Sequence, residues 1–392
     1  MVTSGAPATR GRKLPPVSHL AIVLIAVTFY LATSAGQLRW GSFLSFYTGG
    51  SLVLQGRVGH LYNYAEHARL QAQIADWPPP PPPFIRPPFY AVFFAAFAWM
   101  PFTTALTAWV AANIIALLGS WAWVFRRFGS LGLAAASVFL PPAVGLVNTQ
   151  DCVLLIPLSI AFLLCLERGR DFAAGIVLSA GLFKFHLLLV VPLLLLINRR
   201  WKSLSGYVLG AAVLALISFA LIGPDGTRAY ATLITGRDTA AVVSAAPESM
   251  IDLHALLSTL FNTSPDFSIW GAALGCALAV IAGWRAPLWR WCAAAIVGSL
   301  LAAPHVYKYD AAVLLVPALL ALFKSGQPLT RIAALLALSP LPYYFSSETR
   351  WLATLPPFAL LLLLLCLAIE NMASKPGPLA ARPAGAGGSC LL

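Results

Sequence analysis

The chain has 392 residues, of which 59% are hydrophobic and only 10% charged, and its mean hydropathy is +0.82. A water-soluble globule cannot bury so many apolar residues, and this composition therefore excludes one. A helix needs about 20 apolar residues to cross a hydrocarbon layer of about 30 Å. The apolar runs here are continuous rather than alternating, which predicts an all-α, polytopic membrane protein and not a barrel.

The net charge of +12 could indicate a nucleic-acid partner, but the basic residues are scattered in short loops without interleaved aromatic residues. Basic residues retained on the cytoplasmic side, with contacts to anionic lipid, account for this charge. No CxxC motif or Cys/His cluster is present, so we expect no metal. Five cysteines fall in or beside predicted spans and are expected to be buried apolar residues: Cys152, Cys165, Cys276, Cys292 and Cys366.

The first apolar run covers about residues 20–35 and follows Arg10, Arg12 and Lys13. A cleavable signal peptide has the same appearance, because small residues follow the run. We favour an uncleaved anchor. The basic flank then places the N-terminus in the cytoplasm and residues 41–86 on the outer face of the membrane.

The following apolar runs predict about twelve crossings in one membrane domain, residues 1–373, with extracytoplasmic loops near residues 36–86 and 223–267. Residues 374–392 are expected to be a disordered tail. The predicted spans lie near residues 87–100, 103–125, 131–147, 152–166, 172–197, 204–222, 268–282, 288–303, 311–323, 331–341 and 352–369.

Residues 172–197 form a run longer than one span needs, with Lys184 and His186 at its middle. The run could be one tilted helix or two short ones. Counting it as one places Arg126 and Arg127 outside, whereas the positive-inside rule prefers them inside. The sequence leaves this conflict open.

Residues 41–89 combine aromatic side chains such as Phe43 and Tyr47 with Arg57 and Arg86, in a half of the chain that is otherwise apolar. This mixture indicates a site held at the membrane surface. The sequence contains none of the Walker, GxGxxG, GxSxG or HExxH motifs of soluble enzymes.

Ionisable groups at membrane depth cost several kcal/mol and are retained for function or paired. Asp151, Asp310, Lys184, His186 and His305 lie in or beside apolar runs and rank highest on this criterion. Each also has a structural interpretation. Either aspartate could be a helix N-cap, the lysine could extend to the interface, and His186 could be an ordinary buried histidine.

Five short blocks resemble glycosyltransferase family 87, the polyprenol-phosphate-mannose-dependent mannosyltransferase-like proteins of the GT-C superfamily. The resemblance runs from about residue 41 to residue 320. In chain order the blocks are SFLSFYTGGSLVLQGRVGHLYN, RPPFYAVFFAAFAWMPF, NTQD, LFKFH and PHVYKYD.

The resemblance implies a GT-C bundle that transfers a hexose, mannose by analogy, from a polyprenyl-phosphate donor to a lipid or glycan acceptor without a metal or other cofactor. A base deprotonates the acceptor hydroxyl, and cationic residues stabilise the departing phosphate. The resemblance places the catalytic residue in the first extracytoplasmic loop. The substrate-binding candidates are Arg86, Lys184 and His305, followed by Arg57, His186 and Tyr47.

The chain departs from the family pattern at Ser42, where relatives have an Asp, and at Asn63, where they often have another. Ser42 occupies the expected catalytic position, but a serine hydroxyl is no general base at neutral pH. Either another acid, Asp151, Asp310 or Glu66, reaches the site, or the protein is an inactive relative that binds or moves lipid-linked sugars. A secondary transporter is a third possibility, although no internal repeat is evident.

Overall fold

The computed structural model describes residues 40–75, 82–235, 250–261, 267–346 and 351–374. Within these ranges the chain is helical, apart from one isolated β-bridge between Met250 and Tyr307. The predicted all-α class is therefore confirmed. The first apolar run and the predicted tail from residue 375 lie outside the described residues.

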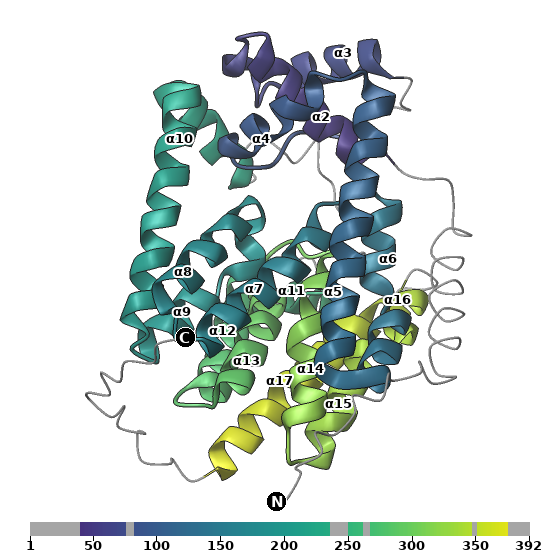
Figure 1. Cartoon of the computed structure of the whole chain (residues 1–392), viewed down its shortest axis with the longest axis vertical. Helices are drawn as coiled ribbons and strands as arrows, with labels where there is room; N and C mark the ends of the chain where they lie inside the picture. The colour runs from purple at the N-terminus through teal and green to yellow at the C-terminus, as the bar shows by residue number, and fades with distance from the viewer. Residues whose placement is uncertain (1–39, 76–81, 236–249, 262–266, 347–350, 375–392) are drawn as a thin grey trace, which may run out of the picture.

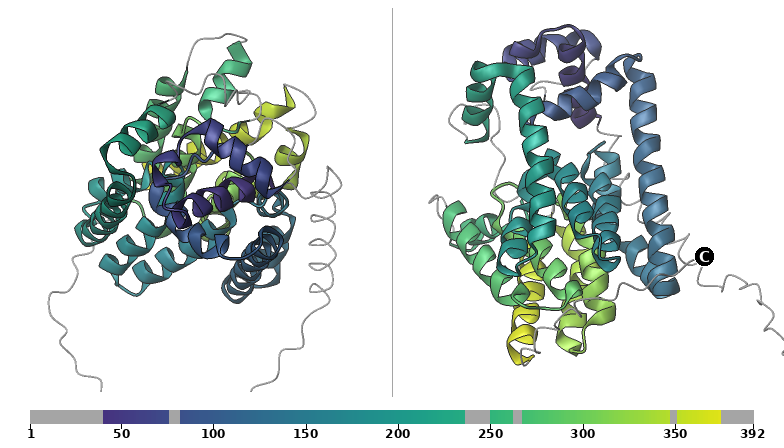
Figure 2. Two further views of the ribbon diagram at one scale, coloured as in Figure 1. Left: turned by 90° about the horizontal axis from the view of Figure 1, so that it is seen from above. Right: turned by 60° about the vertical axis from the view of Figure 1, so that its left-hand side comes forward.

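The first described helices form a cap over one end of the molecule (Figures 1 and 2). Helix α2 is almost entirely buried, and at Gly50 an added Cβ would lie 2.4 Å from the carbonyl oxygen of Phe94 in α4. Residues 87–100 are thus not a span, because α4 has 11 residues and reaches only about 17 Å. The cap contains α2 (Gly41–Leu54), η1 (Val58–His60), α3 (Tyr64–Ile74) and α4 (Pro88–Ala98).

Two long helices, α5 (Phe102–Val138) and α10 (Trp201–Ile234), rise from the body of the bundle to the level of the cap (Figure 1). Each is kinked at a glycine in the left-handed region, Gly129 with φ 70° and Gly223 with φ 63°. Other residues adopt this conformation only at a cost. The predicted loop at residues 223–267 therefore begins as a continuation of α10 beyond its kink.

Between the long helices, a group of short helices reaches the interior and turns back. The run at residues 172–197 is two short arms, since α8 and η3 lead inward to a break and α9 leads out again. Lys184 lies at that break, with non-helical φ −124° and ψ 55°. The group consists of α6 (Leu140–Val147), η2 (Cys152–Leu154), α7 (Leu155–Glu167), α8 (Asp171–Ser179), η3 (Ala180–Leu188) and α9 (Val191–Ile197).

Helices α8 and α10 pack backbone to backbone. A Cβ added to Gly175 would lie 2.0 Å from the carbonyl oxygen of Ser203, and one added to Gly206 would lie 2.1 Å from that of Phe172. Small residues permit this approach in membranes, where packing rather than the hydrophobic effect holds helices together. The close approach continues to the inner end of α8, which leads to Lys184, since a Cβ added to Gly210 would lie 2.0 Å from Ser179 Oγ.

The C-terminal half completes the bundle, with α12 packed along α13 and α17. The predicted span at residues 331–341 is split between two helices that meet at Ser339. The half consists of α11 (Leu253–Phe261), α12 (Ser268–Gly283), α13 (Leu288–Ala302), η5 (Asp310–Leu314), α14 (Leu315–Lys324), α15 (Pro328–Leu338), α16 (Pro340–Phe345), η6 (Leu352–Thr354) and α17 (Leu355–Ala373).

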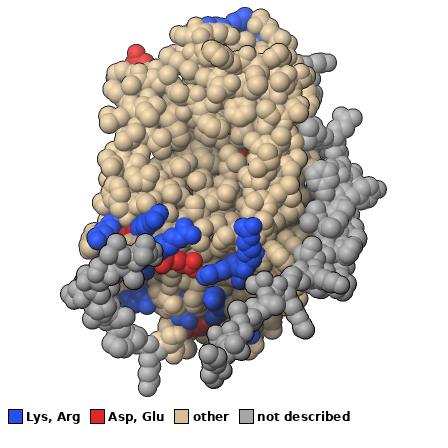
Figure 3. Space-filling view, viewed as in Figure 1, with Lys and Arg blue, Asp and Glu red and all other residues tan. Residues whose placement is uncertain are grey.

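Basic residues from several helix turns gather at the end of the molecule opposite the cap. Arg127 pairs with Glu167 at 2.5 Å, and Arg200 approaches Asp171 at 3.5 Å. Figure 3 shows Lys and Arg in one band near this end, below a broad uncharged surface. Because α8, η3 and α9 are two arms, Arg127 and its neighbour Arg126 lie with the other arginines, and the topological conflict disappears.

Four helical segments among the described residues are long and apolar enough to cross a membrane: residues 102–138, 171–188, 201–234 and 352–373. Five further apolar helices have 10–17 residues. These findings agree with a polytopic helical membrane protein. The predicted number of about twelve crossings stays a prediction.

Candidate functional site

Four charged side chains that are distant in sequence meet in the interior beneath the cap. They are Arg86, Asp151, Lys184 and Asp310, and none is more than 6% exposed. Arg86 precedes α4, Asp151 precedes η2, Lys184 lies at the break in η3, and Asp310 begins η5. We call these four residues the buried quartet.

The quartet is a continuous chain of ion pairs. Nε and Nη2 of Arg86 donate to the two carboxylate oxygens of Asp151, at 2.7 and 2.9 Å. The ammonium of Lys184 lies 3.2 Å from Asp151 Oδ1 and also donates to Asp310 Oδ1. Two cations and two anions make the set formally neutral. Full pairing is necessary because an unpaired charge buried at this depth would cost several kcal/mol.

Asp151 is presented by a strained turn. Thr149 has φ 50°, a left-handed conformation that is rare for a β-branched residue. Its hydroxyl oxygen accepts from the backbone N–H of Phe43 at 3.2 Å, and its carbonyl oxygen accepts from Trp109 Nε1 at 3.0 Å. Contacts from α2 and α5 therefore hold the turn, and strain maintained in this way is typical of functional sites.

Arg86 is fixed from several directions. Pro87 and Pro88 restrict the backbone after it, and its carbonyl oxygen accepts from the hydroxyl of Tyr62 at 2.8 Å. Its guanidinium carbon lies 5.4 Å from the ring centre of Phe46. The Nη1 atom makes no hydrogen bond to the described residues, which leaves a donor for a ligand.

The loop that precedes Asp310 is held in place by a second buried acid, Asp252. Asp310 Oδ2 accepts from the N–H of Tyr307 at 3.0 Å. Fully buried Asp252 accepts from the N–H groups of Val306, at 3.3 Å, and Ala255, at 2.9 Å. Burial raises the pKa of Asp252 to about 7, although its backbone hydrogen bonds act in the opposite direction.

Ser42 joins the quartet through Gln150. The amide nitrogen of Gln150 donates to Ser42 Oγ at 2.7 Å, and its amide oxygen lies 3.5 Å from Lys184 Nζ. Three contacts, through Gln150 and Lys184, thus link the position where an Asp was expected to the carboxylates of Asp151 and Asp310.

The other predicted site residues divide into two groups. His186 is half-buried against the ring of Phe185, and His305 is exposed, yet the two histidines interact electrostatically with each other. His186 also interacts electrostatically with Lys184, Arg86 and Asp151, so it borders the quartet.

Two candidates make their contacts elsewhere in the cap. Arg57 pairs with Glu66, and the Tyr47 hydroxyl donates to the carbonyl oxygen of Met100 at 2.7 Å. The structure does not bring Arg57, Tyr47 or Glu66 to the buried quartet. A substrate role for them stays a prediction.

The N-cap interpretation of the two aspartates does not describe their side chains. Asp151 makes no side-chain cap hydrogen bond, because Arg86 and Lys184 occupy its oxygens. Asp310 accepts from Tyr307, three residues before it, rather than from the helix that follows.

The roles of three residues at the site were not predicted from the sequence: Gln150, Thr149 and Asp252. Gln150 and Thr149 lie in the NTQD block, and a polar run there between two apolar helices was the available signal. Asp252 lies in the predicted extracytoplasmic loop at residues 223–267, but it is fully buried. The local sequence does not reveal this, because one of its two backbone partners, Val306, lies 54 residues away.

A groove of about 430 Å³ opens beside Arg86, between the start of α4, η3 and α10. The groove is mostly apolar, with Ser218, Thr227 and Tyr230 as its hydroxyl-bearing residues. The ring of Tyr230 lies 4.9 Å from the ring of Tyr62, whose hydroxyl donates to the carbonyl oxygen of Arg86. The groove therefore lies next to the backbone of Arg86, although none of the four quartet residues lines it. Its remaining lining residues are Pro87, Pro88, Phe89, Leu182, Phe185, Ala211, Leu214, Ala215, Phe219 and Ile222.

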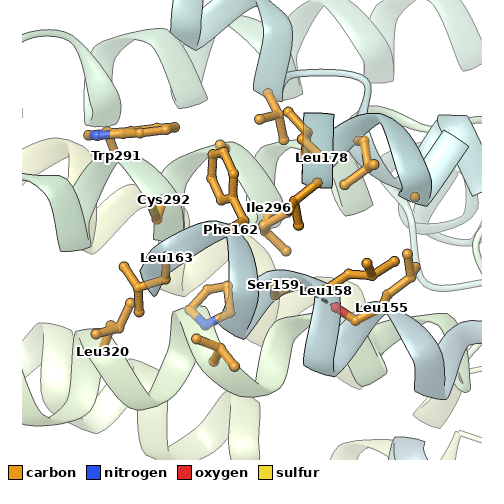
Figure 4. A pocket seen from close by; sticks show the side chains of 17 residues that line it. Leu155, Leu158, Ser159, Phe162, Leu163, Leu178, Trp291, Cys292, Ile296 and Leu320 are labelled. Carbon is orange, nitrogen blue, oxygen red and sulfur yellow. Dashed lines mark hydrogen bonds between the residues drawn. The ribbon is translucent and has the colours of Figure 1, made fainter. Parts of the chain in front are cut away.

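A second cavity, of about 40 Å³, lies among α7, α8, η3, α13 and α14 (Figure 4). Aliphatic and aromatic side chains line it, and the hydroxyl of Ser159 is satisfied by the carbonyl of Leu155 at 2.7 Å. Cys292 is its one ionisable residue. No carboxylate, histidine, lysine or arginine lines this cavity, so the quartet and the groove are the candidate site. No group of three or more His, Cys, Asp or Glu that could hold a metal occurs in the described part of the chain.

Comparison with known proteins identifies a family. A family model described as glycosyltransferase family 87 matches residues 84–304, more than half of the chain. The match contains Arg86, Asp151, Lys184 and His186, and it ends before His305 and Asp310. Searches of curated proteins and of solved structures give no match.

Proposed function

The chain belongs to glycosyltransferase family 87, and from this premise we propose that it transfers a hexose, mannose by analogy, from a polyprenyl-phosphate donor to a lipid or glycan acceptor. The observation that carries the proposal is the buried quartet beside an apolar groove. A lipid-linked sugar phosphate combines a charged group with a long apolar chain, and this site offers a complement to each.

Arg86 and Lys184 are the proposed phosphate-binding residues. A guanidinium supplies donors in a planar fork that suits phosphate oxygens, and an ammonium adds a compact positive charge. Arg86 Nη1 has no acceptor among the described residues and could bind a phosphate oxygen without first losing a contact. In a buried site these charges would stabilise the departing polyprenyl phosphate strongly.

The groove between α4, η3 and α10 is the proposed seat of the first isoprene units. Its apolar lining favours hydrocarbon, and its position beside Pro87 and Pro88 places it one residue from the phosphate-binding Arg86. The phosphate of a lipid that enters from the bilayer would reach Arg86 while its apolar chain stays out of water.

The proposed reaction is an inverting transfer without a metal. A carboxylate removes the proton of an acceptor hydroxyl, the oxygen forms a bond to the anomeric carbon, and the bond from that carbon to the phosphate oxygen breaks. Asp151 and Asp310 are the carboxylates of the quartet. Either of them could serve without an Asp at position 42.

The proposed orientation places the quartet and the cap toward the extracytoplasmic side. The band of arginines lies at the opposite end, and basic turns are retained in the cytoplasm. This orientation agrees with a donor that is presented at the outer face of a bacterial-type inner membrane.

The test is release of polyprenyl phosphate from a polyprenyl-phosphate hexose by the protein purified in detergent, with a membrane lipid extract as acceptor. Arg86→Ala and Lys184→Ala should abolish release. Arg69→Ala and Lys202→Ala remove the same charges from the surface and should leave it unchanged. If Arg86→Ala and Lys184→Ala both retain full activity, the phosphate-binding assignment is wrong.

An inactive relative that binds or moves lipid-linked sugars is the alternative, and the serine at position 42 motivates it. Donor binding without product by the unmodified protein, under conditions where the donor is intact and acceptors are varied, would favour this alternative over transfer.

A further inference from the structure

The two carboxylates of the quartet are not equivalent. Asp151 binds both cations and uses both of its oxygens on Arg86. Asp310 binds one cation, Lys184, and its second oxygen accepts a single backbone N–H. Two carboxylates in different environments can take different roles in one reaction.

Lys184 is the shared partner of the two acids and is fully engaged. Its ammonium has three N–H donors, and Asp151, Asp310 and Gln150 supply three acceptors. A phosphate that binds Lys184 must therefore replace one of them. Asp151 is also anchored by a bidentate pair to Arg86, whereas Asp310 has no second cation. Replacement of Asp151 on Lys184 would leave that acid paired with Arg86 and would free no base, whereas replacement of Asp310 leaves a carboxylate without a cation, at a cost that donor binding must supply.

From this asymmetry we infer that Asp310 is the general base of the transfer and that the donor phosphate frees it by taking its place on Lys184, while Asp151 remains the anchor of both cations. The inference rests on the proposed function. Without the donor, Asp310 is paired with the ammonium of Lys184. Once the donor is bound, the carboxylate lies beside the sugar phosphate without its cation.

The proposed step makes one bond to the anomeric carbon and breaks another. The acceptor O–H bond breaks and its proton passes to Asp310, while the oxygen bonds to the anomeric carbon. The bond between that carbon and the phosphate oxygen breaks, and polyprenyl phosphate leaves with the electron pair, held by Arg86 and Lys184. A base that becomes active only after the donor has bound also requires the donor to bind before the acceptor is deprotonated.

Asp310→Asn should lower kcat and at the same time strengthen the binding of polyprenyl phosphate. The variant should lose about 10²–10⁴-fold in kcat, the usual contribution of general-base catalysis. It should also bind polyprenyl phosphate about tenfold more tightly, because the phosphate no longer competes with a carboxylate for Lys184. A residue with only a structural role would not lower kcat and raise affinity together.

The experiment measures kcat, and separately the Kd for polyprenyl phosphate, in detergent-purified full-length protein. Asp310→Glu retains a carboxylate and should recover part of kcat. Asp225→Asn makes the same chemical change at an exposed residue and should alter neither quantity. A single symmetric peak in size-exclusion chromatography shows that each variant is folded.

Weaker polyprenyl phosphate binding by Asp310→Asn, or a kcat within tenfold of the unmodified protein, would overturn the inference. A loss of kcat confined to Asp151→Asn would transfer the base role to Asp151. If the unmodified protein binds donor but never turns it over, the proposed transfer fails and the base assignment fails with it. The affinity of Asp310→Asn would still report whether phosphate and carboxylate compete.

Discussion

Gln150 Nε2 donates a 2.7 Å hydrogen bond to Ser42 Oγ across 108 residues of sequence. This bond joins the position where relatives have an Asp to the strained turn that carries Asp151. Gln150 also lies within reach of Lys184, so a change at position 42 is transmitted to the quartet through one amide side chain.

Ser42→Asp is therefore expected to weaken the site rather than restore it. The quartet is already neutral, and a further carboxylate beside it adds negative charge where the donor phosphate must bind. We expect a higher KM for the donor and no gain in kcat. Ser42→Ala, which removes one hydrogen bond worth about 1 kcal/mol, should keep turnover within about threefold. A tenfold rise in kcat with Ser42→Asp would contradict this account.

Removing one member of the Arg86–Asp151 pair should destabilise the protein more than removing both charges. Arg86→Met leaves Asp151 without its bidentate partner and should cost about 3 kcal/mol, the typical effect of breaking a buried pair. Adding Asp151→Asn to Arg86→Met should recover part of the loss. Thermal unfolding in one detergent compares the single and double variants, and strict additivity of the two changes would argue against coupling.

Substitutions of Thr149 should separate its backbone strain from its hydrogen bond. Thr149→Val keeps a β-branched residue at φ 50° and leaves the Phe43 N–H without an acceptor, so we expect a loss of about 1–3 kcal/mol. Thr149→Asn keeps a polar side chain and tolerates this conformation better, so it should cost less. The order of the unfolding midpoints is the measurement, and a lower midpoint for Thr149→Asn than for Thr149→Val would contradict both the strain and the hydrogen-bond assignment.

Asp252 should make stability depend on pH. Its pKa is about 7 in the folded protein, above the value of about 4 for an unfolded chain, so the folded state binds the proton more readily. Its contribution is fully present below the unfolded pKa and is lost as pH rises toward 7. The unfolding midpoint should thus fall by a few degrees between pH 5 and pH 8, and the fall should be smaller in Asp252→Asn. Equal slopes in the two proteins would exclude Asp252 as the cause.

Filling the apolar groove should discriminate between donors by chain length. Ala211→Trp places an indole in the groove and should raise KM for a long polyprenyl-phosphate hexose, with less effect on a donor that has one short isoprenoid unit. Ala212→Trp introduces the same bulk at the adjacent residue of α10, which does not line the groove. An identical response to both substitutions, or to both donors, would show that the lipid chain binds elsewhere.

Parts of the fold follow from local sequence. Continuous apolar runs predict α12, α13 and α17 closely, because burial in hydrocarbon requires the backbone to satisfy its own hydrogen bonds. The same rule fails for residues 87–100, since α4 has only 11 residues and is apolar both where it packs against α2 and at the exposed Val92 and Phe93. Composition alone does not distinguish such a short helix from a span.

The sequence by itself determined the membrane class, the family resemblance and the short list of ionisable residues, because apolar length and rare buried charges are local properties. Only the tertiary structure decided which of them meet. Arg86 and Asp151 are 65 residues apart, and Lys184 and Asp310 are 126 apart. A left-handed Thr149, a broken η3 and the loop held by Asp252 bring them together, and each depends on packing with distant helices. Tyr47 and Arg57 were also candidates from the sequence, but packing within the cap gives them the partners Met100 and Glu66 instead.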